Sequence, residues 1–175
     1  MNGRLLGAVL AGGQSRRFGS DKALALLDGR TLLERAVTRL GQWCEAVVVI
    51  GRETAPVPVV ADWPRPGMGP LGGIAGALRH ARAEGFGAVL TLGVDSLGLP
   101  VDLPALLGPG PAYVSDQPVV AFWPVAALGA AEAILGSEGR HSVRALADAT
   151  AARPVVLATP SANVNTPEDL ARLRM

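Results

Sequence analysis

Residues 10–22 read LAGGQSRRFGSDK and follow directly on a short apolar run, residues 5–10, whose composition predicts a buried strand. Gly12 and Gly13 carry no Cβ atom, so backbone N–H groups there can approach a ligand closely. A curled run of such N–H groups binds anions. Three basic residues stand in the same stretch: Arg16, Arg17 and Lys22. The combination predicts a loop that holds the phosphates of a nucleoside triphosphate.

Two better-known phosphate motifs do not fit this stretch. The Gly-Lys-Ser/Thr ending of the P-loop is absent, and so is the G-x-G-x-x-G fingerprint of dinucleotide-binding folds. The competing interpretation is an ordinary surface loop with solvated arginines, and glycines alone would favour it. Lys22, however, is the one lysine among 16 basic residues. A compact ammonium differs in its contacts from a planar guanidinium, so its position favours the phosphate loop.

Short apolar runs alternate with helical patterns along the whole chain. Strands are predicted over residues 5–10, 46–50, 57–61, 88–92, 113–115, 119–122 and 154–157. Helices are predicted over residues 32–40, 74–83, 126–135, 142–149 and 166–172, and a loop rich in Pro and Gly over residues 64–73. Thr31, with Glu34 three residues later, predicts a capping box at the start of the first helix.

This alternation predicts the α/β class: one domain over residues 1–175, built as a three-layer α/β/α sandwich around a mostly parallel, Rossmann-like sheet. Ligands of such sheets bind beyond the carboxyl ends of the strands. The segments after Leu10, Ala61 and Leu92 should therefore open on one edge.

Composition narrows the classes of function. Of the 175 residues 49% are hydrophobic and 18% charged, and the net charge of +1 lacks the basic excess of nucleic-acid-binding proteins. No apolar run approaches the roughly 20 residues of a membrane helix. A single cysteine, Cys44, excludes an internal disulfide and a metal site made of several cysteines. We expect a cytoplasmic protein that binds neither nucleic acid nor membrane.

Three further stretches carry candidate ligands. Asp95 comes just after the strand predicted over residues 88–92, where a carboxylate suits Mg²⁺; the alternative is a turn or helix cap. Asp62 and the glycines of residues 67–73 would lie beside a base or ribose, unless they form a plain surface loop. Asn163 and Asn165 precede Thr166 and Pro167, which predict a helix start but leave the two asparagines unexplained.

Residues 10–22 resemble the signature loop of nucleotidyltransferases with the glycosyltransferase-A-like fold, the nucleotide-diphospho-sugar transferase type. Together with Gly69-Pro70-Leu71, Asp95 and residues 163–169, they resemble the molybdenum cofactor guanylyltransferase family over nearly the whole chain. The resemblance implies transfer of GMP from GTP to molybdopterin with release of pyrophosphate, using Mg²⁺. It also implies other molybdenum cofactor biosynthesis or acceptor proteins as partners.

The resemblance assigns a role to each matching position. Lys22, Asp95 and Arg16 are the expected catalytic residues, and Asp95 is the expected Mg²⁺ ligand. The residues expected to contact the nucleotide, the metal or the second substrate are Leu10, Ala11, Gly12, Gly13, Lys22, Asp62, Asp95 and Asn165.

The chain departs from the family pattern at three places. It has Ile50-Gly51-Arg52 where the family usually ends its second core strand with asparagine. It has Val94-Asp95-Ser96-Leu97 in place of Cys-Asp-x-Pro, and Gln117-Pro118 in place of a His-Pro pair. Two alternatives stay open: a related cytidylyl- or sugar-phosphate nucleotidyltransferase, and a non-catalytic GTP-binding adaptor.

Overall fold

A computed structural model describes residues 3–12, 21–159, 162–163 and 169. Its described residues form a seven-stranded central sheet in the order β10-β8-β9-β6-β1-β4-β5. The strands are β1 (Leu5–Leu10), β4 (Ala46–Ile50), β5 (Val59–Val60), β6 (Ala88–Gly93), β8 (Ala112–Val114), β9 (Gln117–Pro124) and β10 (Arg153–Val155). Neighbouring strands are parallel except where β9 runs antiparallel to β6 and β8. The expectation of a mostly parallel sheet is confirmed.

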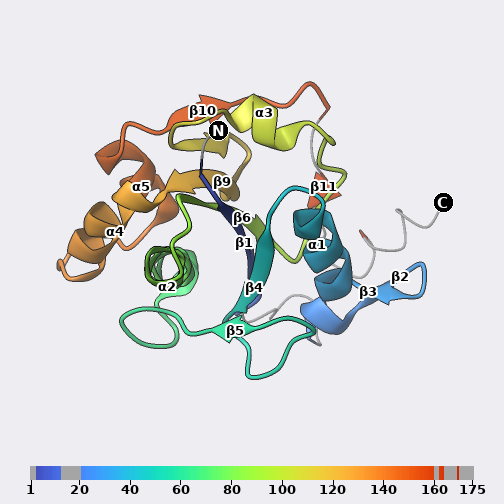
Figure 1. Cartoon of the computed structure of the whole chain (residues 1–175). Helices are drawn as coiled ribbons and strands as arrows, with labels where there is room; N and C mark the ends of the chain where they lie inside the picture. The colour runs from blue at the N-terminus through green and yellow to red at the C-terminus, as the bar shows by residue number, and fades with distance from the viewer. Residues whose placement is uncertain (1–2, 13–20, 160–161, 164–168, 170–175) are drawn as a thin grey trace.

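Helices cover both faces of the sheet (Figure 1). One face carries α2 (Gly69–Ala83), α4 (Leu128–Leu135) and α5 (Val143–Ala149); the other carries α1 (Leu32–Gly41) and α3 (Leu103–Leu107). Alternation along β1 divides the core, because Leu6 and Ala8 pack with α2 while Val9 packs with α1. The predicted three-layer arrangement is therefore confirmed.

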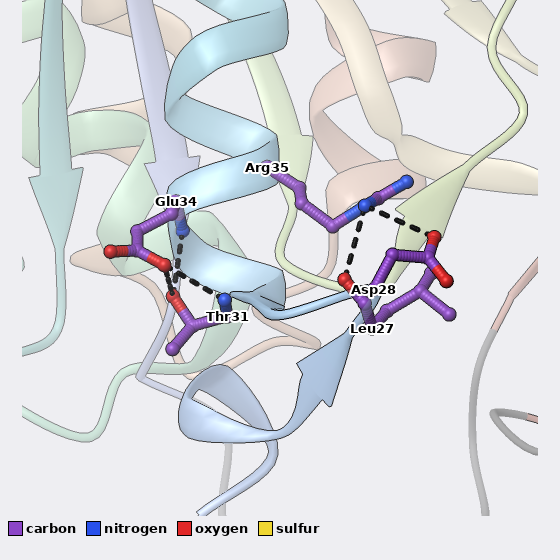
Figure 2. Close-up of polar contacts among 5 residues, drawn as sticks. All are labelled: Leu27, Asp28, Thr31, Glu34 and Arg35. Atoms are coloured by element: carbon purple, nitrogen blue, oxygen red, sulfur yellow. Dashed lines mark hydrogen bonds and ion pairs between the residues drawn. The ribbon is translucent and has the colours of Figure 1, made fainter.

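A small hairpin, β2 (Leu26–Leu27) and β3 (Arg30–Thr31), leads into α1 (Figure 2). Its turn has positive φ at Asp28 (51°) and Gly29 (77°), as a tight two-residue hairpin requires. The predicted capping box is present: Glu34 N–H donates to Thr31 Oγ1 over 3.1 Å, and Thr31 N–H donates to Glu34 Oε2 over 2.8 Å. Arg35 donates back to the Leu27 carbonyl over 3.1 Å, so the hairpin is tied to the helix.

Helix α2 begins at Gly69, whereas the sequence predicts a loop through residue 73, so the predicted boundary is wrong. Pro70 stands in the first turn of the helix, where proline is tolerated. Glycine is needed inside α2 for close packing rather than for a loop: a Cβ on Gly76 would lie 2.2 Å from the Ala61 carbonyl oxygen. Packing against β5 and the segment after it outweighs the low helix propensity of glycine.

Other elements differ in extent. Two strands are shorter than expected. Strand β5 covers only part of the expected range 57–61, and β10 begins one residue before the expected range 154–157 and ends within it. The pairing of β7 (Ser96–Leu97) with β11 (Ala162–Asn163) is not predicted from the sequence. The helix expected over residues 166–172 falls almost wholly outside the described residues. Within the described part of the chain, no helix has the length and apolar character needed to cross a bilayer.

Candidate functional site

The strands β1, β4 and β6 end at one edge of the sheet. In the parallel register Leu10 pairs with Ile50 on one side and with Gly93 on the other. The residues that follow the three strands therefore meet at the carboxyl edge of the sheet. They are Ala11-Gly12 after β1, Gly51-Arg52 after β4 and Val94-Asp95 after β6. This is the edge where open α/β sheets bind ligands, and three of the stretches discussed above converge on it.

Lys22 and Asp95 are in direct contact at this edge. The Lys22 Nζ donates a hydrogen bond to Asp95 Oδ2 over 2.6 Å. Lys22 is the first residue of η1 (Lys22–Leu24) and is only 9% exposed. A buried ammonium is costly unless it is paired, and Asp95 supplies that pair from the end of β6. The structure thus brings together two residues that the sequence analysis selected separately.

The backbone of Gly12 lies directly against that of Gly51. Ala11 N–H donates to the Ile50 carbonyl over 3.0 Å, which continues the strand pairing one residue further. A Cβ on Gly51 would lie 2.5 Å from the Gly12 Cα and 2.7 Å from its nitrogen. Gly51 also has φ +81°, which favours glycine. The sequence analysis did not select Gly51 as a site residue. A glycine directly after a buried strand is the signal that could have identified it.

A second ion pair links the end of β4 to the residue before Lys22. The Arg52 guanidinium donates to both carboxylate oxygens of Asp21, over 2.7 Å and 3.1 Å. This hydrogen bonding holds the pKa of the Asp21 carboxyl below its ordinary value of 3.8, and the same contact raises the pKa of Arg52. Asp21 is a pairing partner that sequence reasoning missed, because the partners are 31 residues apart.

The Asp95 carboxylate packs closely against Gly93, the last residue of β6. A Cβ on Gly93 would lie 2.5 Å from Asp95 Oδ1, so only glycine leaves room for the carboxylate where it stands. The Ser96 Oγ is buried, and no described residue gives it a hydrogen-bond partner. Ser96 pairs with Asn163 across β7 and β11. The chain of the C-terminal motif therefore passes beside Asp95, although Asn165 itself lies outside the described residues.

Asp62 occupies a separate position beyond β5. Its Oδ2 accepts a hydrogen bond from Gly67 N–H over 3.3 Å, and a Cβ on Gly73 would lie 3.6 Å from its Oδ1. The carboxylate thus stands beside the first turns of α2, and its described partner is the turn at residues 62–67. None of its described contacts is with Lys22 or Asp95.

Two more expected site residues, Gly13 and Arg16, lie outside the described residues, as Asn165 does. Across residues 3–12, 21–159, 162–163 and 169, no three His, Cys, Asp or Glu side chains cluster closely enough to hold a metal ion between them. Any cation at this edge would depend on Asp95 together with oxygens from a ligand or water.

In this α/β fold the strand ends bring paired glycines, a buried ammonium and a carboxylate to one edge of the sheet. Such an arrangement suits the binding of phosphate. Residues 7–160 match the family model described as the MobA-like NTP transferase domain. The match spans most of the 175 residues. The chain therefore belongs to this family of nucleotidyltransferases.

Individual relatives are similar over nearly their full length. A molybdenum cofactor guanylyltransferase of Acidiphilium cryptum is 37% identical over 180 residues, which cover 95% of this chain and 92% of the relative. A probable molybdenum cofactor guanylyltransferase of Mycobacterium marinum is 38% identical and covers 95% and 91%.

Among solved structures, the molybdopterin-guanine dinucleotide biosynthesis protein A of Archaeoglobus fulgidus superimposes with a TM-score of 0.76. It is 21% identical to this chain, and the match covers 97% of this chain and 96% of that one. At this identity the likeness supports the fold, and it agrees with the sheet described above.

Proposed function

We propose that this chain transfers GMP from GTP to molybdopterin and releases pyrophosphate. The full-length relatives named molybdenum cofactor guanylyltransferase support this activity. The structural observation that carries the proposal is the part-buried Lys22–Asp95 pair, which lies at the same ligand edge of the sheet as Gly12. The pair places a cation that can bind phosphate, Lys22, next to a carboxylate, Asp95.

In the proposed reaction a phosphate oxygen of molybdopterin attacks the α-phosphorus of GTP. A new phosphorus–oxygen bond forms as the bond to the β-phosphate bridging oxygen breaks, and the electron pair leaves with pyrophosphate. The chain needs no covalent nucleophile, because phosphoryl transfer is promoted mainly by positioning and by offsetting charge. Lys22 would offset phosphate charge, and the backbone at Leu10, Ala11 and Gly12 would hold the nucleotide.

Mg²⁺ fits the donors present at this edge. Asp95 Oδ2 is engaged by Lys22, whereas Oδ1 accepts no hydrogen bond from any described residue. One carboxylate with phosphate and water oxygens is a common way for proteins to bind Mg²⁺. When bound, the ion would offset charge on the phosphates. Asp95 is therefore the residue that we propose to hold it.

The other expected residues complete the proposed site. Gly13 and Arg16 would add phosphate contacts, Asp62 would face the nucleoside side, and Asn165 the second substrate or metal. Docking to other molybdenum cofactor biosynthesis or acceptor proteins and a cytoplasmic location also belong to the proposal.

The test is incubation of the purified chain with GTP, Mg²⁺ and molybdopterin, followed by mass analysis for the guanine dinucleotide and by a pyrophosphate assay. We expect both products. Parallel reactions with CTP and with sugar phosphates as acceptors test the related transferase activities, and pyrophosphate release only there would replace the proposal. Tight GTP binding without release of pyrophosphate under any acceptor would identify an adaptor instead.

A further inference from the structure

Asp21 and Arg52 form a fork that is better fixed than an ordinary surface pair. Both terminal nitrogens of the guanidinium reach the carboxylate, and the Arg52 side chain is 17% exposed. A planar guanidinium on a carboxylate fixes direction as well as distance. The Arg52 Nε is buried and receives no partner from the described residues. The fork therefore fixes where the Asp21 carboxylate lies.

The same carboxylate fixes the start of η1. Asp21 is the N-cap residue of η1, and its Oδ1 accepts a hydrogen bond from Ala23 N–H over 3.1 Å. The Ala25 N–H closes the turn by donating to the Lys22 carbonyl over 3.1 Å. Because Lys22 is the first residue of this turn, the direction of its side chain depends on how Asp21 is held.

Gly51, the residue before Arg52, contacts the glycine backbone of the candidate site. Gly51 lies against Gly12, whose backbone is expected to hold the nucleotide. The two residues after β4, Gly51 and Arg52, therefore each fix one part of the site. Gly51 sets the position of Gly12, and Arg52 sets the position of Asp21 and hence of Lys22.

We propose that Arg52 is a positioning residue that acts through Asp21 to hold the Lys22 ammonium in place for the phosphates of the nucleotide. This inference rests on the proposed function in so far as the nucleotide is GTP. Arg52 also neutralises a carboxylate next to Lys22, which would otherwise repel phosphate. Direct contact between Arg52 and the nucleotide is not required, because both terminal nitrogens already bond Asp21.

A double-mutant cycle on GTP affinity tests the proposal. The dissociation constant of GTP with Mg²⁺ is measured by calorimetry for the wild type, Arg52→Ala, Lys22→Ala and the double variant. We expect Arg52→Ala to weaken binding about tenfold, the lower end of what loss of an orienting partner costs. In the Lys22→Ala background the same change should alter affinity by less than about twofold, because the residue through which it acts is gone.

An equal loss in both backgrounds would overturn the proposal, and so would unchanged affinity in Arg52→Ala. Should Arg52→Ala fail to fold, Asp21→Asn replaces it in the cycle, since asparagine still caps a helix but cannot form the charged fork. The matched control is Arg4→Ala. It removes an ion pair to Glu45 of 2.8 Å at the opposite end of β1, and it should leave GTP affinity unchanged.

Dinucleotide formation by the wild type is measured in the same preparation. If the wild type binds GTP but forms no dinucleotide, the proposed function fails while the cycle still decides the role of Arg52. If dinucleotide forms and the two changes are additive, the positioning role fails and the function stands.

Discussion

The ammonium of Lys22 and the carboxylate of Asp95 lie 2.6 Å apart although 73 residues separate them in the chain. The contact joins η1, which lies between β1 and β2 in the chain, to the end of β6. Phosphate charge arriving at this edge would meet a lysine that is already oriented.

Replacing Lys22 should remove most of the transfer activity. Lys22→Ala leaves the half-buried carboxylate of Asp95 without its cation, and we expect a loss of about a hundredfold or more in the transfer rate. Lys22→Arg should not restore it, because a planar guanidinium does not reproduce the contact of a compact ammonium in a space this closed. The measurement is dinucleotide formation per enzyme under saturating GTP. Wild-type turnover in the Arg variant would contradict the prediction.

Substitution of Gly51 should damage both the fold and nucleotide binding. In Gly51→Ala the new Cβ meets the Gly12 backbone at 2.5 Å, and the residue keeps φ +81°. Backbone strain of this kind costs about 1–3 kcal/mol. We expect a lower free energy of unfolding in urea and weaker GTP binding.

The matched control for that change is Gly41→Ala, in the last turn of α1. A Cβ there meets nothing within 4 Å, and alanine suits a helix better than glycine. Gly41→Ala should therefore hold or raise the unfolding free energy and leave GTP affinity unchanged. Equal behaviour of the two variants would show that the Gly12–Gly51 contact is unimportant.

Local patterns in the sequence predicted the local features well. The strand β1 and the Thr31–Glu34 capping box each depend on residues within a few positions of one another. These features could be predicted because their physical causes lie within those short stretches of sequence.

Features that depend on distant partners were not predictable in the same way. The glycines of α2 indicate a loop by propensity, and only the nearby Ala61 carbonyl shows why they stand in a helix. Lys22 and Asp95 were each identified, but no spacing rule gives their contact. The fork between Asp21 and Arg52 needs the ends of β1 and β4 side by side, which is a property of the sheet.

Acid should weaken the fold partly through Asp21. The hydrogen bond from Arg52 keeps the pKa of Asp21 below its ordinary value of 3.8. A carboxyl whose pKa is lowered by folding stabilises the fold above its ordinary pKa, and this contribution is lost as pH falls through the lowered value. Below pH 3.8 the unfolding free energy of the wild type should therefore fall more steeply than that of Asp21→Asn.

The size of that difference should stay below about 1 kcal/mol, because the Asp21 side chain is 45% exposed and solvent screens the pair. Urea unfolding at a series of pH values measures it. Parallel curves for the two proteins throughout the acid range would refute the assignment of this acid-sensitive contribution to Asp21.

Adding a methyl group at Gly93 should displace Asp95 without unfolding the chain. The Cβ of Gly93→Ala would lie 2.5 Å from Asp95 Oδ1, the end of a side chain that can rotate away. We expect a transfer rate reduced about tenfold or more, since small misplacements of site groups are costly, with little change in unfolding free energy. Gly110→Ala is the control, because a Cβ there meets nothing within 4 Å. Full activity in Gly93→Ala would show that the position of Asp95 is not critical.

The last prediction separates two interpretations of Asp95 by one substitution. If Asp95 holds Mg²⁺, Asp95→Asn keeps the size and one oxygen but loses the charge, and transfer should fall by about two to three powers of ten. GTP binding should weaken much less, because Lys22 and the backbone near Gly12 remain.

If Asp95 is instead a turn cap, asparagine should substitute well, since both residues cap. Among the described residues the carboxylate accepts a hydrogen bond from Lys22 and from no backbone N–H, which favours the first interpretation. Transfer rates and GTP dissociation constants are measured across a Mg²⁺ titration. Near-normal turnover of Asp95→Asn at saturating Mg²⁺ would decide for the cap, whereas a slow variant with nearly intact GTP affinity would place the carboxylate in the chemical step.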